Sequence, residues 1–308
     1  MMKKMEKPLL TVSVCTRKRP ELVKKCLESL LTQDTEIPFD VVVVENDVNQ
    51  ESREIIENYI EAARKIGLEM RYFCEPEQNI ALARNRCIQE CRGEFVLFID
   101  DDEFAAKDWI EKMVEIQRRT DADVVQGTCV PVFPEEFPAL FRYGSIYPYE
   151  AFSEECARVP GVTTNTTLYR LSALSERQQP LDPAYGTTGG SDFELSLYLD
   201  GIGKTQYKTS LAKVYEFQPL KRASFLFFME RNFREALNTY RAIRKYCGRC
   251  GTMRFLVLRF KQKLTGSLKA LICFPVHPLI SSLKLLENLS GMLGLICAAF
   301  GLKKTGYR

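Results

Sequence analysis

The first 133 residues alternate between short apolar runs and amphipathic segments, and this alternation limits the fold more than any other feature. The apolar runs are nearly continuous, as is typical of strands buried on both faces of a parallel sheet. The segments between them carry apolar residues at helical spacing. We predict strands over 9–15, 39–46, 69–74, 95–100 and 122–133, and helices over 20–33, 51–67, 79–93 and 106–119.

This pattern predicts an α/β fold with a Rossmann-like, mostly parallel sheet and helices on both of its faces. Residues 134–220 are irregular and rich in proline, so we expect them to elaborate the same domain and to complete a pocket. Residues 221–308 are predicted to be helical. The expected organisation is therefore a catalytic domain over 1–220 and a helical C-terminal region over 221–308.

Four carboxylates stand at the end of the fourth predicted strand, in the stretch FVLFIDDDEF (95–104). They repel one another, so a positive partner is expected beside them. Mg²⁺ and Mn²⁺ prefer carboxylate oxygens and commonly use one or two of them together with substrate phosphates. Asp100 and Asp102 point to the same face if the strand continues, which suits such a site. The alternative is an acidic cap on the next helix, where carboxylates favour the helix dipole.

Polar residues also follow the first two predicted strands. Thr16, Arg17 and Arg19 come after the first strand, and Glu45 and Asp47 come after the second. Ligands of such sheets bind beyond the carboxyl ends of the strands. We therefore expect three strand ends to meet at one polar crevice.

These segments resemble, in their order and spacing, the family 2 glycosyltransferases of the GT-A fold, of the bacterial polysaccharide-biosynthesis type. The resemblance extends over about residues 9–240, and its most specific parts are NIALARNRCI leading into FIDDDEF, and the later GGSDFEL (189–195). It implies an inverting glycosyltransferase that uses Mn²⁺ or Mg²⁺. The implied substrates are a nucleotide-sugar donor, expected to be UDP-linked, and a hydroxyl of a surface-glycan or lipid-linked acceptor.

The resemblance also implies roles for individual residues. Asp102 is the expected metal ligand, with Asp100 and Glu216 as further candidates. Many GT-A enzymes have a histidine at the position of Glu216, and the one histidine of this chain, His277, lies far along the sequence. Arg84 is expected to bind the nucleotide, and its alternative role is an ion pair that holds Asp100 in place. The residues expected to bind the nucleotide are Thr16, Arg17, Arg19, Glu45, Asp47, Arg84, Asp100 and Asp101.

Asp192 matches the general base of the family, which removes the proton of the acceptor hydroxyl as that hydroxyl attacks the sugar. Gly189 and Gly190 let the backbone approach the sugar closely. Glu194 points the same way as Asp192 if the segment is extended. If the segment is helical, the acidic residues lie in its first turn instead. Asn165, in the stretch VTTNTTLYR, is expected to line the sugar pocket.

The C-terminal region is strongly basic, with 17 Lys and Arg against three Asp and Glu from 221 to 308. Two apolar segments follow within 264–300; Pro275 and Pro278 break the first, and Lys284 and Glu287 separate it from the second. Neither offers about 20 uninterrupted apolar residues, so helices lying in a membrane interface are expected. We predict a peripheral protein on the cytoplasmic face of the plasma membrane, with no nucleic-acid partner. The alternative is a solvated basic helix face.

The eleven cysteines form no recognisable framework, so we expect them to be reduced and mostly buried, as in a cytosolic protein. Cys247 and Cys250 form a C-x-x-C without a second pair, which argues against zinc. The N-terminal stretch MMKKMEKPLL lacks the apolar region of a signal peptide.

Two other functions compete with glycosyl transfer. A nucleotidylyltransferase would use a glycine-rich phosphate loop after the first strand, and the loop here, CTRKRPE, has no glycine. A catalytically silent relative would act only as a binding or scaffold protein. Loss of the acidic residues at 100–102 or 192 would favour that reading, and all of them are present.

Overall fold

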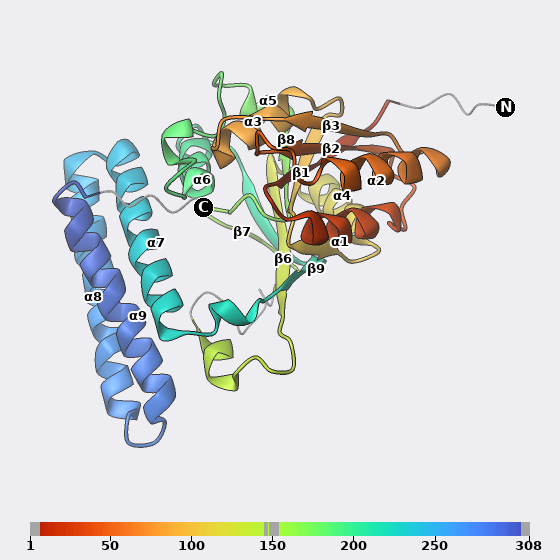
Figure 1. The fold of residues 1–308 in the computed structure, drawn as a ribbon. Coiled ribbons are helices and arrows are strands. Elements are labelled where there is room, and N and C mark those ends of the chain that lie inside the picture. Colours follow the sequence, from red (N-terminus) through yellow and green to blue (C-terminus); the bar gives the residue numbers. More distant parts are fainter. Residues whose placement is uncertain (1–6, 145–146, 148–153, 303–308) are drawn as a thin grey trace.

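The computed structural model describes residues 7–144, 147 and 154–302, and its first half confirms the predicted alternation (Figure 1). Each predicted strand and helix is present, with ends that differ by a few residues. The elements are β1 (Leu10–Thr16), α1 (Pro20–Leu31), β2 (Phe39–Glu45), α2 (Arg53–Lys65), β3 (Met70–Cys74), α3 (Ile80–Gln89), β4 (Phe95–Asp100), α4 (Trp109–Thr120) and β6 (Val124–Val132).

The central sheet has nine strands in the order β3-β2-β1-β4-β8-β6-β9-β5, and β7 pairs with β9. Strands β3, β2, β1 and β4 are parallel, so their carboxyl ends lie along one edge. In register, Leu10 of β1 pairs with Phe39 on one side and with Phe95 on the other. This parallel half positions the polar residues that follow β1, β2 and β4.

Helices cover both faces of the sheet, as predicted. Along β2, Val41 and Val43 are buried on one face with side chains of α1, α2 and α4. Val42 and Val44 are buried on the other face with side chains of α3 and of a later helix, α6 (Ser191–Gly201). Because successive strand residues point to opposite faces, a continuous run of valines fills both layers of the core.

The prediction that 134–220 is irregular was wrong in part, because this segment completes the sheet. Strand β8 runs antiparallel to both β4 and β6, and the 12-residue β9 runs parallel to β6. Short proline-bounded helices lie between these strands. The elements are β5 (Glu103–Ala105), η1 (Ala139–Tyr143), β7 (Cys156–Arg158), β8 (Thr167–Arg170), α5 (Leu171–Leu174), η2 (Pro183–Tyr185), α6 and β9 (Gln206–Phe217).

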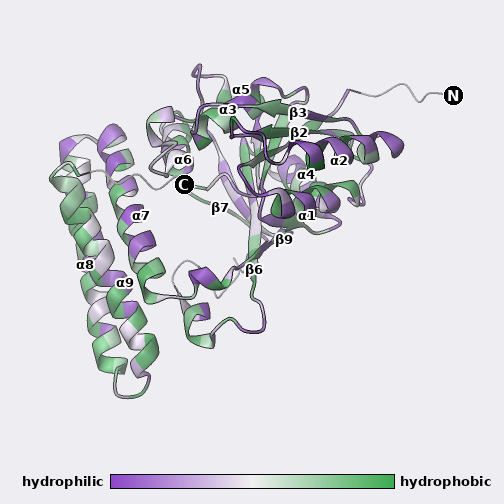
Figure 2. Cartoon of the chain, viewed as in Figure 1, coloured by the Kyte–Doolittle hydropathy of each residue, from purple (hydrophilic) through white to green (hydrophobic). Residues whose placement is uncertain are grey.

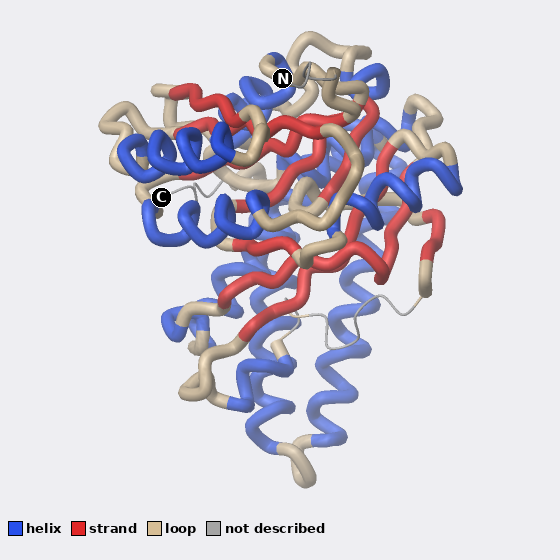
Figure 3. Tube along the Cα trace, turned by 90° about the vertical axis from the view of Figure 1, so that its right-hand side faces the viewer, coloured by secondary structure: helices blue, strands red, loops and turns tan. Residues whose placement is uncertain are grey.

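Three long helices form the C-terminal region and stand beside the α/β body (Figures 1 and 3). A short 3₁₀ turn, η3 (Leu220–Arg222), leads into α7 (Phe225–Tyr246), which is followed by α8 (Gly248–Cys273) and α9 (Pro278–Ala299). Pro275 and Pro278 lie at the turn between α8 and α9, which confirms the predicted break. Lys284 and Glu287 do not separate two segments, because both lie within α9.

The helix α9 packs closely on α7. Leu237 and Tyr240 of α7 share a buried cluster with Leu295 and Ala298 of α9. A Cβ atom on Gly294 would lie 2.5 Å from the carbonyl oxygen of Phe233, so only glycine permits this approach of the two backbones. One face of α9 therefore belongs to the protein core.

Helices α8 and α9 are rich in hydrophobic residues (Figure 2), and many of these side chains are exposed. Of 22 exposed large hydrophobic side chains in the described residues, 15 lie between Met253 and Leu302. Within that described part, α9 is the one helix that has the length and composition to cross a membrane. Eleven free cysteines are described, and the expectation that most are buried was wrong: two are buried, six are half-buried, and Cys247, Cys250 and Cys273 are exposed.

Candidate active site

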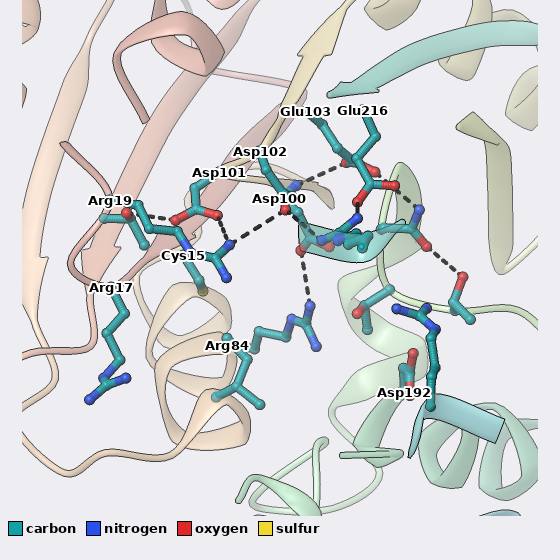
Figure 4. A pocket seen from close by; sticks show the side chains of 17 residues that line it. Cys15, Arg17, Arg19, Arg84, Asp100, Asp101, Asp102, Glu103, Asp192 and Glu216 are labelled. Atoms are coloured by element: carbon teal, nitrogen blue, oxygen red, sulfur yellow. Dashed lines mark hydrogen bonds and ion pairs between the residues drawn. The ribbon is translucent and has the colours of Figure 1, made fainter. Parts of the chain in front are cut away.

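A polar pocket of about 350 Å³ opens at the carboxyl ends of β1 and β4 (Figure 4). This position confirms the expected crevice for the ends of β1 and β4, whereas Glu45 and Asp47 after β2 do not line it. Five arginines and six carboxylates line it, together with Thr16, Thr163, Thr164 and Asn165. The charged residues are Arg17, Arg19, Arg84, Arg222 and Arg231, with Asp100, Asp101, Asp102, Glu103, Asp192 and Glu216.

The acidic run does not cap the next helix. Strand β4 ends at Asp100, a turn follows, and Glu103 begins the short strand β5. Helix α4 starts only at Trp109, with Asp108 at its N-cap. The capping alternative is therefore wrong, and the four carboxylates stand in a tight turn beside the pocket.

Arginines provide the positive partners that the acidic run requires. Arg84 of α3 donates to Asp100 with 3.0 Å between Nη2 and Oδ1. Arg19 donates to Asp101 at 3.0 Å, and Thr16 donates to the other oxygen of Asp101 at 2.8 Å. Burial alone would lower the pKa of Arg84, but the neighbouring Asp100 raises it, so the guanidinium stays charged. The loop after β1 and helix α3 are thus tied to the acidic turn.

Asp102 lies close to two arginines. Its contacts with Arg19 and Arg222 are long, at 3.5 and 3.4 Å. Burial raises the pKa of Asp102 to about 7, and the charges of Asp100 and Glu216 add to the effect. A carboxylate that is buried, poorly paired and close to other carboxylates is suited to take up a further cation.

A second carboxylate reaches the same place from strand β9. Glu216 lies directly opposite Glu103 in the antiparallel pairing of β5 with β9. Glu103 is buried and accepts bonds from the backbone NH of Asp100 at 3.0 Å and from Asn165 at 3.1 Å. Burial, and then the charge of Asp100, raise the pKa of Glu103 well above its ordinary range. Asp102 and Glu216 both line the pocket, and Arg222 contacts both of them.

Asp192 reaches the pocket from the first turn of α6 (Figure 4). The preceding Gly189 and Gly190 have φ angles of 89° and 87°, a left-handed backbone that favours glycine. The segment is helical and not extended, in agreement with the alternative stated for the sequence. Asp192 and Glu194 therefore point to different sides of the helix. Asp192 faces the pocket, whereas Glu194 is fully buried against Arg177 and Lys245.

The structure does not bring every predicted residue to this pocket. Glu45 is buried and accepts bonds from the Ser52 backbone NH at 2.7 Å and from Tyr72 at 2.9 Å. Asp47 is buried with Lys18 3.9 Å away. These two lie at the end of β2, and Glu194 lies on the side of α6 that contacts α7. Gly189 and Gly190 shape the turn before Asp192 and do not line the pocket.

Sequence reasoning gave no role to Glu103 or Arg222. Glu103 belongs to the acidic stretch itself, and its burial follows from the turn that places it on β5. Arg222 lies in a linker with no motif. Its place at the pocket can be seen only from the position of η3 beside β9. Arg231 belongs to a basic helix that we expected to contact anionic headgroups or the diphosphate of a lipid-linked acceptor, with a solvated face as the alternative, and it lines the pocket from α7.

The residues present fit a divalent cation with few protein ligands. No group of three or more His, Cys, Asp and Glu side chains arranged for a metal ion occurs in the described part of the chain. The two carboxylates Asp102 and Glu216 supply hard oxygen atoms, which Mg²⁺ and Mn²⁺ prefer. These ions commonly take their remaining ligands from substrate phosphates and water.

Solved structures show the same fold over nearly the whole chain. The mannosyltransferase PcManGT from Pyrobaculum calidifontis, solved with GDP-Man and Mn²⁺, is 15% identical, with a TM-score of 0.66 over 96% of this chain and 88% of that one. S. aureus TarS in complex with UDP-GlcNAc is 14% identical, with a TM-score of 0.53 over 97% of each chain. The protein is therefore an α/β protein with the GT-A type of fold.

The sequence comparisons define the family. The family description "Glycosyl transferase family 2" matches residues 11–177, more than half of the chain. A curated relative, the succinoglycan biosynthesis protein ExoM of Rhizobium meliloti, is 29% identical over 227 residues, which span 73% of this chain and 72% of that protein. The chain belongs to glycosyl transferase family 2 and is a glycosyltransferase of the bacterial polysaccharide-biosynthesis type.

Proposed function

We propose that this glycosyltransferase moves a sugar from a UDP-sugar to a hydroxyl of a surface-glycan or lipid-linked acceptor, with inversion at the anomeric carbon. The observation that carries the proposal is that Asp192 and the acidic turn line one pocket together with five arginines. An acceptor hydroxyl beside Asp192 has a base for its proton, and a diphosphate beside the arginines has partners for its charge.

The charges of the pocket support a donor that arrives with a metal ion. Six carboxyl groups stand beside five guanidinium groups, so much of the positive charge of the pocket is already paired within the protein. The diphosphate of a nucleotide-sugar brings further negative charge, for which the pocket has little unpaired positive charge. Asp102 and Glu216, with Asp100 beside them, are the residues that would hold Mn²⁺ or Mg²⁺. When bound, the ion supplies positive charge beside the leaving diphosphate.

We assign nucleotide binding to the residues around the ends of β1, β2 and β4. Arg17, Arg19 and Arg84 provide charge for the phosphates, and Thr16, Asp100 and Asp101 form the adjoining wall of the pocket. Glu45 and Asp47 hold the loop after β2, where the base and ribose would lie. The titles of the related structures name UDP-GlcNAc and GDP-Man, so donors of both nucleotide types belong in a test.

We assign proton removal to Asp192. It lies at the N-terminal turn of α6, where the helix dipole favours a negative charge. The left-handed turn at Gly189 and Gly190 lets the chain pass close to a bound sugar. Asn165, which donates to Glu103, is placed to contact the sugar from the opposite wall. Attack from the side of Asp192, away from the diphosphate, gives inversion in a single displacement.

The C-terminal helices support a position on the cytoplasmic face of the plasma membrane. The connection between α8 and α9 and its flanks expose Ile272 (77%), Val276 (72%) and Leu279 (63%). Exposed apolar patches of this kind mark interaction surfaces, and the basic side chains of the region suit anionic lipid headgroups. A membrane position would bring the pocket to a lipid-linked acceptor.

A donor screen tests the proposed function. Thermal unfolding of the full chain is followed with UDP-, GDP- and dTDP-sugars, each with and without Mn²⁺. A ligand at about 100 times its dissociation constant stabilises a protein by about 2.7 kcal/mol, which shifts the melting temperature measurably. We expect a shift with UDP-sugars that requires Mn²⁺. If no nucleotide-sugar shifts the transition, the chain is a silent relative and the proposal is wrong.

A further inference from the structure

Arg222 bridges the two carboxylates that we assign to the metal ion. Its Nη1 donates to Oε1 of Glu216 at 2.5 Å, and its Nη2 lies 3.4 Å from Oδ2 of Asp102. The side chain of Arg222 is 17% exposed, and those of Asp102 and Glu216 are 14% and 24% exposed. One guanidinium therefore neutralises both carboxylates at a site largely shielded from water.

No other arginine of the pocket makes this bridge among the described contacts. Arg19 pairs with Asp101 and Asp102, and Arg84 pairs with Asp100. Arg222 differs also in its place in the chain, because it lies in the turn η3 between β9 and α7. Its side chain reaches the site from a connecting segment and not from the sheet that holds the carboxylates.

A guanidinium and a divalent cation repel each other when they share one pair of carboxylates. Arg222 contacts Oε1 of Glu216 and Oδ2 of Asp102, and an ion on the same pair would lie close to the guanidinium. The ion and Arg222 therefore compete for Asp102 and Glu216. The guanidinium fork also fits phosphate oxygens in a bidentate manner, and Arg222 lines the pocket in which the diphosphate would lie.

We propose that Arg222 is the exchangeable counter-ion of Asp102 and Glu216: it occupies the carboxylate pair in the empty site and turns to the donor's phosphates when nucleotide-sugar and divalent cation enter together. This inference rests on the proposed function. It assigns Arg222 two successive partners, and it makes the affinity for metal alone low until the donor arrives.

Titration with Mn²⁺ alone, followed by electron paramagnetic resonance of the free ion, tests the proposal on the full chain. The test variant is Arg222→Met, which keeps the length of the side chain and removes the charge. The control variant is Arg231→Met, which removes a positive charge from the same pocket without touching either carboxylate. General loss of positive charge affects both variants, whereas loss of the bridge affects only the first.

We expect Arg222→Met to bind Mn²⁺ at least about tenfold more tightly than wild type, because two charge-assisted contacts no longer compete. We expect Arg231→Met to change the affinity by less than about threefold. With saturating Mn²⁺, Arg222→Met should bind UDP about tenfold more weakly than wild type, because a phosphate partner is lost. Equal or weaker Mn²⁺ binding by Arg222→Met overturns the proposal.

Two further measurements keep the outcome clear. If Arg222→Met does not unfold cooperatively, Arg222→Lys is used in its place, because a lysine lacks the fork that holds both carboxylates. A rise in its Mn²⁺ affinity supports the proposal, and an unchanged affinity contradicts it. If wild type binds a UDP-sugar equally well with and without Mn²⁺, this inference fails while glycosyl transfer stands. If wild type binds no nucleotide-sugar, the proposed function itself fails.

Discussion

Asn238 of α7 donates a hydrogen bond to the carbonyl oxygen of Thr188, with 2.8 Å between Nδ2 and the oxygen. Thr188 is the residue before the two glycines that lead to Asp192. Arg241, one helical turn further along α7, donates to the hydroxyl of Thr188 at 2.8 Å. The C-terminal region therefore positions the turn that carries the proposed base, and the domain boundary predicted at 220/221 separates residues that work together.

Gly190→Ala tests how tightly this turn is held. Gly190 has φ 87°, and an added Cβ would lie 2.9 Å from Cβ of Asn238. Gly203→Ala is the matched control, because its φ is 83° and nothing lies within 4 Å. We expect Gly203→Ala to cost about 1 kcal/mol of unfolding free energy and Gly190→Ala about 2 kcal/mol or more. Urea unfolding measures both, and equal losses would show that Asn238 gives way freely.

Glu194→Gln tests the buried link between α6 and α7. Glu194 is fully buried and accepts from Arg177 at 2.7 Å, from Lys245 at 2.6 Å and from Tyr246. Burial alone would raise the pKa of Glu194, but the bonds from Arg177 and Lys245 outweigh it and lower the pKa. We expect Glu194→Gln to lose about 3 kcal/mol of unfolding free energy at pH 7, because Arg177 loses its carboxylate partner and Lys245 keeps only Asp182.

The pH dependence of that loss has a definite sign. A carboxylate with a lowered pKa in the folded state contributes stability above its unfolded pKa, and this contribution is lost as the pH falls through the folded value. The gap between wild type and Glu194→Gln should therefore narrow in acid. Glu61→Gln is the control, since Glu61 forms an exposed pair with Arg64 and should change stability by less than about 0.5 kcal/mol. A constant gap from neutral to acidic pH would contradict the assignment.

The sequence was sufficient for the parallel half of the fold because its signals are local. The valine run of β2 and the apolar stretch before Asp100 predict strands buried on both faces. The positions where these strands end follow from the ends of the apolar runs. Local signals do not predict the partners of Asp102: Glu216 was expected only from the family resemblance, and Arg222 was not expected. Glu216 faces it only because β5 and β9 pair antiparallel, and Arg222 arrives from a turn whose position depends on α7.

The role of Glu194 shows the same limit. Only Phe193 separates it from Asp192, and an extended segment would have directed both side chains to the sugar. The helix α6 turns Glu194 by roughly half a turn, toward the basic side chains of α7. That choice depends on packing against residues about 50 positions away, which local propensity does not encode.

Asp102→Asn tests the electrostatic cost of the acidic turn in the metal-free protein. Burial and the charges of Asp100 and Glu216 raise the pKa of Asp102 to about 7. A carboxyl with a raised pKa contributes stability below its unfolded pKa, and this is lost as the pH rises through about 7. We expect the unfolding free energy of Asp102→Asn, measured by urea unfolding, to rise relative to that of wild type by about 2 kcal/mol or more from pH 5 to pH 8.

Asp200→Asn, on the exposed end of α6, is the control for that measurement and should shift by less than about 0.5 kcal/mol over the same range. If the unfolding free energies of wild type and Asp102→Asn changed by the same amount between pH 5 and pH 8, the proposed electrostatic cost of Asp102 would be contradicted. Carboxylates that destabilise the folded protein without a cation, and are stabilised by one, are expected where function competes with stability.

The apolar tip of the α8–α9 hairpin is tested by the double variant Ile272→Glu and Val276→Glu. Both side chains are exposed, at 77% and 72%, so folding should be preserved. We expect binding to vesicles that contain anionic lipid to fall more than about tenfold, because two charges would have to enter the interface. Vesicle sedimentation measures the bound fraction.

The matched control places the same charges elsewhere, as Ile66→Glu with Ile202→Glu, whose side chains are 61% and 42% exposed. It should bind vesicles as wild type does. Undiminished binding by the tip variant would remove the proposed membrane surface. Truncation before α8 is a poorer test, because it would uncover the buried cluster of Leu237 and Tyr240 on α7.

The most direct test of the account is the comparison of sugar transfer and donor binding in Asp192→Asn. Asp192 is assigned to proton removal and not to the donor, so the two quantities should separate. With the donor found by the screen, and with Mn²⁺, we predict that kcat falls by about 10²- to 10⁴-fold while the dissociation constant of the donor changes by less than about threefold. Transfer by Asp192→Asn at close to the wild-type rate would contradict the account.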